Sequence, residues 1–222
     1  MGSISLKKKP GRPFDQAKRL AIIEAASLRF FEHGFAATSI EQVAADAGVS
    51  KVTVYNHFGD KRGLFTAAVE LECEKMRGFF SLEDTLEGTI RERLEAIGEG
   101  MIAFLSRPEM IQFERRIAAE TEVEPAIGHA FLKAGPWRMK EAFADFLAYA
   151  NEVGELSVPD PILGAEQFAA LCKGMGDLDQ RFGRQVTSAD RARRISGAVD
   201  VFLEAYSTGS SAGNGRNLGW PS

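Results

Sequence analysis

Apolar residues recur along most of the chain at intervals of three and four, the spacing that places side chains on one face of an α-helix. Leu20, Ile23, Ala26 and Phe30 form the first such face, which ends at Gly34, a residue suited to a helix C-cap. Comparable apolar faces follow at about residues 40–47, 51–58, 60–80, 86–104, 110–117, 125–134, 137–149, 160–182 and 188–206. No sustained run alternates between apolar and polar residues, as a half-buried strand would require. The sequence therefore predicts an all-α fold.

The segment at residues 38–61 has the proportions of a helix-turn-helix motif. Gly48 permits a tight turn between two short helices, and Ser50 is a natural N-cap for the second helix. Val54 and Phe58 lie four residues apart on that helix, so both face the core. The opposite face carries small or polar side chains, with longer donors on its flanks. A helix that enters the major groove of DNA needs this distribution.

Three kinds of DNA contact are expected from this segment. Hydroxyl and backbone N–H groups at helix starts suit phosphates, small polar side chains suit base edges, and flanking donors suit the phosphate walls. Each residue also has a structural explanation, as a helix cap, a half-buried aromatic, a structural histidine or a solvated charge. The agreement of caps, turn, core positions and flanks favours DNA binding. The predicted contacts are Thr38, Ser39, Ser50, Lys51, Val52, Thr53, Tyr55, Asn56, His57 and Lys61.

Charge is distributed unevenly along the chain. Residues 1–62 carry ten Lys/Arg and six Asp/Glu, a net charge of +4, whereas the rest carries −8. A basic end suggests contact with a polyanion, although a solvated tail explains the charge equally well. We expect residues 1–14 to form a disordered basic arm. Its Gly-Arg-Pro tripeptide resembles an AT-hook core, so Arg12 is predicted to contact DNA, either in an A·T-rich minor groove or at a phosphate.

The stretch TSIEQVAADAGVSKVTVYNHFGDKRGLF resembles the DNA-binding segment of the TetR/AcrR family of transcriptional regulators. The resemblance runs from about residue 15 to residue 70 and implies a three-helix DNA-binding domain at 15–76. Val52 departs from the family pattern, in which Gly or Ala is common there, and this bears on base preference. Arg62-Gly63 also departs from it, which weakens a helix start. The resemblance implies phosphate contacts for Thr38, Tyr55, His57 and Lys61, and base contacts for Lys51, Val52, Thr53 and Asn56.

For residues 77–206 the resemblance implies a helical domain that binds a small ligand and forms a homodimer, with about nine helices in the whole chain. Apolar stripes near the C-terminus support such an interface independently, although an intrachain core would produce the same spacing. The tail at 207–222 is rich in Gly and Ser and is predicted to be disordered. The predicted dimer interface comprises Phe168, Leu171, Met175, Ile195, Val199 and Phe202.

Composition favours an apolar ligand pocket in this second domain. Eleven of the sixteen phenylalanines and five of the six methionines follow residue 62. Pockets for small molecules are lined mainly by such side chains, although most of these residues will serve only as core. The candidate lining residues are Phe104, Phe113, His129, Phe131, Trp137, Phe143, Phe168 and Met175.

An enzyme is the main alternative class, and the sequence offers it little support. None of the three histidines follows a Glu by three residues, and no zinc-protease, serine-hydrolase or P-loop motif is present. No metal or cofactor is expected, nor is a secretory signal or a membrane span. We therefore expect a cytoplasmic, non-enzymatic regulator.

The predicted regulator is a homodimeric repressor that binds a palindromic operator in double-stranded DNA and is released by a small apolar or aromatic effector. A regulator that activates, or that needs a co-repressor, is the alternative within the same class. A helical small-molecule-binding protein without a DNA function is the alternative outside it.

Overall fold

The computed structural model describes residues 13–77 and 88–208, with side chains for 16–74 and 88–208. Arg12 and nearly all of the predicted arm and tail lie outside the described residues. Within these ranges the regular structure is helical, apart from one isolated β-bridge between Leu156 and Ser207. The predicted all-α fold is therefore confirmed. No described helix is long and apolar enough to cross a membrane.

The helices form two compact units, and each unit is interrupted in sequence. Unit 1 combines residues 1–74 with 112–135, and unit 2 combines residues 75–111 with 136–222. The domain boundaries expected from the sequence, 15–76 and 77–206, do not anticipate the second segment of unit 1.

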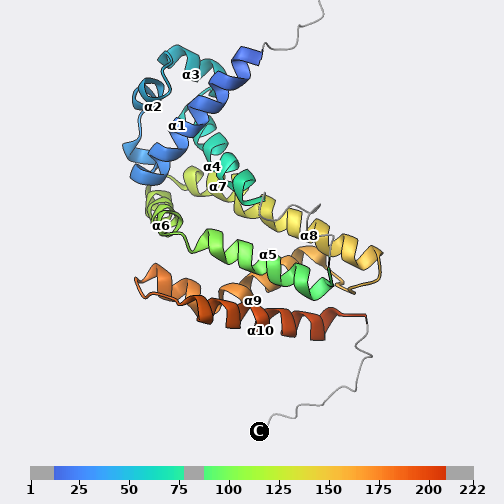
Figure 1. Cartoon of the computed structure of the whole chain (residues 1–222). Coiled ribbons are helices and arrows are strands. Elements are labelled where there is room, and N and C mark those ends of the chain that lie inside the picture. Colours follow the sequence, from blue (N-terminus) through green and yellow to red (C-terminus); the bar gives the residue numbers. More distant parts are fainter. Residues whose placement is uncertain (1–12, 78–87, 209–222) are drawn as a thin grey trace, which may run out of the picture. The chain divides into compact units, whose positions relative to one another are not determined.

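Unit 1 contains α1 to α3, most of α4 and α6, and all of α7 (Figure 1). Phe30, Phe65 and Phe113 are fully buried in its core. The ring centroid of Phe65 lies 5.3 Å from that of Phe30 and 6.2 Å from that of Phe113. Because α1, α4 and α6 each supply one ring, a single aromatic cluster joins these three helices. The helix bounds are α1 Pro13–Ala37, α2 Ile40–Asp46, α3 Lys51–Phe58, α4 Lys61–Arg77, α6 Pro108–Val123 and α7 Pro125–Ala134.

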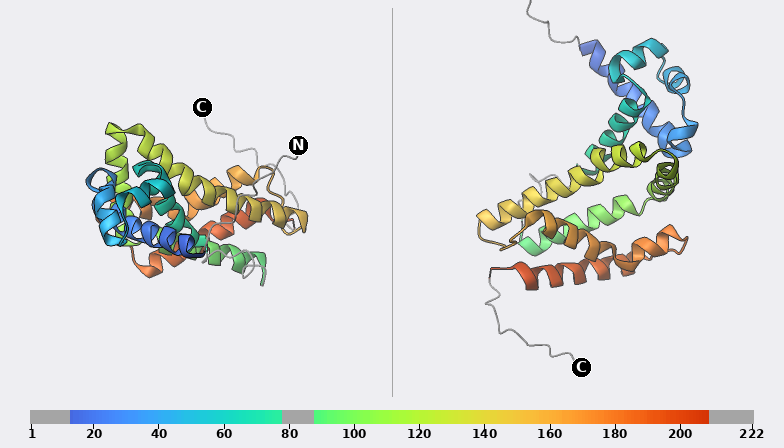
Figure 2. Two further views of the ribbon diagram at one scale, coloured as in Figure 1. Left: turned by 90° about the horizontal axis from the view of Figure 1, so that it is seen from above. Right: turned by 180° about the vertical axis from the view of Figure 1, so that it is seen from behind.

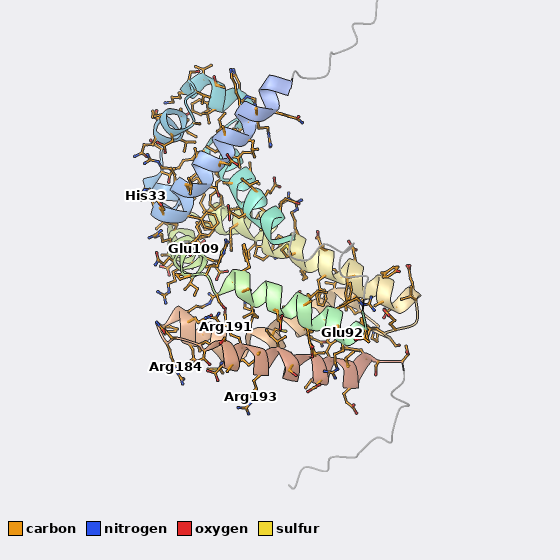
Figure 3. All side chains as sticks on the ribbon, in the orientation of Figure 1. His33, Glu92, Glu109, Arg184, Arg191 and Arg193 are labelled. Atoms are coloured by element: carbon orange, nitrogen blue, oxygen red, sulfur yellow. The ribbon has the colours of Figure 1, made fainter. Side chains whose placement is uncertain are left out.

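Unit 2 contains α5 (Ile90–Leu105), the start of α6, α8 (Pro136–Glu152), α9 (Pro161–Arg181) and α10 (Ser188–Tyr206). Helix α9 packs against α8 and α10, and α10 packs against α5 (Figure 2). Side-chain caps fix where these helices begin; Glu92, for example, completes a reciprocal capping box at the start of α5 (Figure 3). The shared core buries Leu94, Phe146, Leu147, Phe168, Val199 and Phe202 almost completely.

The structure divides the predicted dimer interface into two groups. Phe168, Ile195, Val199 and Phe202 are at most 4% exposed within the core of unit 2, so they have no surface to offer a second chain. This part of the prediction needs correction, because helical spacing alone does not distinguish an intrachain core from an interface. Leu171 and Met175 are 40% and 66% exposed, and they stay candidates.

Replacing Phe146 by Ala is expected to lower the free energy of unfolding by about 3–5 kcal/mol, because its fully buried ring leaves a cavity. Urea unfolding followed by circular dichroism measures this effect. Tyr149→Ala is the matched control on the same helix, since Tyr149 is 43% exposed, and its effect should stay within about 1 kcal/mol. Equal effects of the two substitutions would contradict the packing of α8.

Candidate nucleic-acid interface

Helix α2 and the turn after it are held by short-range hydrogen bonds that the sequence encodes. The Ser39 hydroxyl accepts from the backbone N–H of Gln42, whose side chain accepts in return from the N–H of Ser39. Gly48 adopts φ 65°, and the N–H of Val49 then donates to the carbonyl of Ala44 at 2.9 Å. The turn therefore needs a residue that tolerates the left-handed region, as the sequence predicted.

Helix α3 presents the side chains that the sequence assigned to DNA. Its Ser50 cap accepts a hydrogen bond from the N–H of Thr53 at 3.2 Å, and Val54 is buried at 1% exposure. Thr53 and His57 are half-buried. The exposed residues are Lys51, Val52, Tyr55 and Asn56, with Val52 at 66% and Tyr55 at 40%. One buried position with an exposed opposite face is the arrangement of a helix available to the major groove.

The exposed Lys51 is paired with Glu41 of α2. Its ammonium donates to the Glu41 carboxylate, which lowers the pKa of Glu41 and raises the pKa of Lys51. The same ammonium lies 5.7 Å from the centre of the Tyr55 ring. Both partners of the ion pair are exposed, so the pair contributes little to stability. Exchanging Glu41 for a DNA acceptor would therefore cost little.

Thr38 has a different environment from the one the sequence suggested. Its side chain is 2% exposed, and its hydroxyl donates to the carbonyl of Gly34 at 2.8 Å. Its backbone N–H donates to the carbonyl of Phe35. The predicted phosphate contact through this hydroxyl needs correction, because both donors of Thr38 are used within unit 1. Thr38 stabilises the junction between α1 and α2.

Lys61 also links parts of unit 1. Its ammonium donates to the carbonyl of Ala36 at 3.3 Å and lies 4.4 Å from the centre of the Phe35 ring. Partial burial lowers the pKa of Lys61, while the nearby carboxylates of Glu120 and Glu124 act in the opposite direction. Lys61 therefore joins the start of α4 to the end of α1. A DNA phosphate in contact with Lys61 would have to share its ammonium group with the carbonyl of Ala36.

Glu120 of α6 fixes the same junction, and the sequence gave no indication of this role. Helix α1 is interrupted at Gly34, where φ is 86°. The Glu120 carboxylate accepts hydrogen bonds from the freed backbone N–H groups of Phe35 at 3.0 Å and Ala36 at 3.2 Å. A Cβ at position 34 would lie 2.5 Å from Glu120 Oε1, so both the conformation and the space require glycine.

Two further contacts strengthen this attachment of α6 to α1. The Arg116 guanidinium donates to the carbonyl of Phe31 at 2.7 Å. The rings of Phe31 and Phe113 stack with centroids 4.0 Å apart. We name the contacts made by Arg116, Glu120 and Phe113 the α6 clamp. Periodicity marks Phe113 as apolar, but no local pattern reveals which backbone groups an α6 side chain reaches.

The eight predicted pocket residues are divided between the two units. Phe113, His129 and Phe131 belong to unit 1, and the other five belong to unit 2. Phe113 and Phe168 are fully buried among other rings, which identifies them as core. Met175 is 66% exposed. Phe104 is buried, Phe143 is half-buried, and Trp137 is 39% exposed.

Comparison with known proteins gives matches in both parts of the chain. Residues 22–68 match the family described as bacterial regulatory proteins, tetR family, and residues 92–208 match the AefR-like transcriptional repressor C-terminal domain. The uncharacterized HTH-type transcriptional regulator YvkB of Bacillus subtilis is 25% identical over 187 residues, which cover 84% of this chain and 95% of that protein.

Two solved structures are similar over most of their length. A putative TetR-family regulator from Mesorhizobium loti is 26% identical, with a TM-score of 0.74, and the match covers 88% of this chain and 100% of that one. The flavonoid-responsive regulator FrrA is 29% identical, with a TM-score of 0.69, over 86% of this chain and 98% of that one.

The α6 clamp predicts that Glu120→Gln destabilises unit 1. A neutral amide oxygen is a weaker acceptor than a carboxylate oxygen. The amide NH₂ group is a donor, so it cannot accept the second of the two backbone N–H bonds. We expect a loss of about 1–2 kcal/mol, reduced from the buried case because the site is partly exposed. Urea unfolding measures the loss. Glu122→Gln, an exposed change on the same helix, should have no measurable effect; equal losses would refute the clamp.

Proposed function

The chain belongs to the TetR family of bacterial regulatory proteins, and on this premise we propose that it is a homodimeric repressor that binds a palindromic operator through α3. It is a transcriptional regulator with a DNA-binding helix-turn-helix, not an enzyme. The exposed face of α3 is the observation that carries the proposal. The match of residues 92–208 to the AefR-like repressor domain supports a repressor rather than an activator.

We assign base contacts to the exposed face of α3 and phosphate contacts to its flanks. Lys51, Val52, Thr53 and Asn56 read base edges, with Lys51 leaving Glu41 as DNA binds. The flanking and capping donors that contact phosphates are Ser39, Ser50, Tyr55 and His57, with Lys61 contributing while it holds Ala36. Arg12, which lies outside the described residues, is proposed to reach the minor groove.

The proposed dimer forms through the exposed apolar face of α9. Leu171, Met175, Leu178 and the C-cap residue Phe182 are 40%, 66%, 46% and 84% exposed. Met175, Leu178 and Phe182 all follow the interruption of α9 at Gly174, and their three- or four-residue spacing places them along one side of this last part of the helix. Exposed apolar patches of this kind mark protein interfaces. A second copy of this chain is the partner, because two half-sites of a palindrome require two copies of α3.

The effector is proposed to be a small apolar or aromatic molecule that lowers operator affinity in the cytoplasm. The aromatic-rich composition of unit 2 supports this class, as does the flavonoid response named for FrrA. The effector needs to favour the non-binding state by only about 1–3 kcal/mol, the usual range of allosteric coupling.

The DNA-binding proposal is tested by titrating the full chain against its own upstream DNA and against a scrambled duplex at several salt concentrations. The five phosphate donors assigned to each subunit, or about ten per dimer, predict a log–log slope of roughly −9. Tight binding to the upstream DNA alone is expected. Absence of binding to either duplex at low salt would refute the proposal.

Two variants in the same titration separate base contacts from phosphate contacts. Asn56→Ala should reduce the difference in binding free energy between the upstream and the scrambled duplex by about 1–3 kcal/mol, because an amide that contacts a base edge is lost. Tyr55→Phe should weaken both complexes alike. Unchanged affinity in both variants would show that α3 is not the DNA-binding element.

The dimer is tested by Phe182→Asp, which places a charge in the proposed interface without touching the core. We expect the solution mass, measured by sedimentation or light scattering, to shift from dimer toward monomer. Val153→Asp, at a 50% exposed position outside α9, is the matched control and should leave the mass unchanged. A dimer that withstands Phe182→Asp would place the interface elsewhere.

A further inference from the structure

A small cavity in unit 2 lies between the end of α5, the middle of α9 and the beginning of α10. Ile102, Leu105 and Val186 give it an apolar wall, and Lys173, Arg191 and Arg194 bring three cationic side chains to it. It has room for about one water molecule. None of the eight residues predicted to line a ligand pocket contributes to this cavity.

A break in α9 creates the space beside the arginines. Gly174 has φ 45° and ψ −150°, so the helix is interrupted there. Gly176 faces the guanidinium of Arg194: a Cβ at this position would lie 2.1 Å from Nη1. The missing side chain at position 176 therefore provides the seat that Arg194 occupies.

The two arginines bring more positive charge to the cavity than it contains acceptors to balance. Nε of Arg191 is buried without a hydrogen-bond acceptor among the described residues. Asp177, the carboxylate in the cavity wall, is already paired with Lys173 at 3.8 Å and with Arg181 at 3.1 Å. Burial raises the pKa of Cys172 to about 12, so this thiol in the wall stays neutral.

The neighbouring Asp190 does not resolve this imbalance. Its carboxylate accepts hydrogen bonds from Thr187, whose hydroxyl oxygen lies 2.8 Å away. Those bonds are the main cause of its lowered pKa, and Arg194 and Arg184 contribute only at longer range. In the part of the chain that the structure describes, no ion pair within 4.0 Å is formed by Arg191 or Arg194.

We propose that Arg191 and Arg194 bind the carboxylate of a small organic acid at this cavity. A guanidinium offers two parallel N–H donors that match the two oxygens of a carboxylate. One oxygen of the carboxylate would occupy the water-sized space and supply the missing acceptor to Arg191, so the smallest acids suit the site best. The binding site is separate from the DNA-facing surface of α3, so the proposal holds or fails independently of DNA binding.

Calorimetric titration of the full chain tests the site, with formate, the smallest carboxylate, as the probe at constant ionic strength. Wild type should bind formate saturably, and the double variant Arg191→Gln/Arg194→Gln should bind it at least about tenfold more weakly. Arg193→Gln is the matched control, since Arg193 extends from α10 into solvent and does not line the cavity (Figure 3). Its affinity should equal that of wild type.

Gly176→Ala provides a second variant that keeps both arginines and suits a helix. The added methyl group displaces the Arg194 guanidinium, so weaker formate binding is expected, while resistance to unfolding by urea should be no lower than in wild type. Formamide, a neutral molecule of similar size, and inorganic phosphate complete the experiment, and both should bind more weakly than formate. The proposal is overturned by absence of saturable binding, by equal affinity in the double variant, or by tighter binding of phosphate.

Discussion

The interruption of α1 at Gly34 is the constraint on which the DNA-facing surface depends. A helix that breaks there leaves two backbone N–H groups without helical acceptors, and a buried or half-buried N–H without an acceptor is costly. Glu120 supplies both acceptors from a residue 85 positions later in the chain. Thr38 and Lys61 bind carbonyls on the same turn. The position of α2, and of α3 after it, is therefore determined by this one junction.

Family resemblance and local pattern predict the helices, and the caps and the turn of the helix-turn-helix, well. Ser39, Gly48 and Ser50 act within four residues of themselves, so their roles as caps and turn are readable from the sequence. The sequence does not identify the role of Thr38, because a threonine before a helix can cap the helix, donate to a DNA phosphate or donate to a buried carbonyl. Burial of Thr38 by the fold decides between these roles: its hydroxyl donates to the carbonyl of Gly34, four residues before it, and lies 3.2 Å from that of Arg29.

Contacts between distant segments were not predictable in the same way. Nothing in the residues around Glu120 indicates that its carboxylate meets α1, and helical spacing does not separate Phe168 and Val199 in the core from Met175 at the surface. The sequence shows that Arg191 is charged, but it does not show that its Nε atom is buried. These features depend on which helix faces fold together, a property of the whole chain.

The cationic side chains of the two units thus have different environments. In unit 1, Lys51 sits in an exposed ion pair that exchanges readily, and Lys61 is committed to the junction. In unit 2, the half-buried Arg191 and Arg194 form no ion pair within 4.0 Å with any described residue. The proposed DNA surface therefore has mobile charge at its edge and fixed backbone geometry beneath it, an arrangement suited to preorganised contact.

Amide hydrogen exchange of the full chain with and without its bound upstream DNA tests the central claim most directly. Helix α3 is presented to DNA and α9 is not, so the account predicts added protection in peptides covering residues 38–61. Peptides of α9 should exchange as in the free protein. Protection confined to unit 2, with residues 38–61 unchanged in the bound state, would contradict the account.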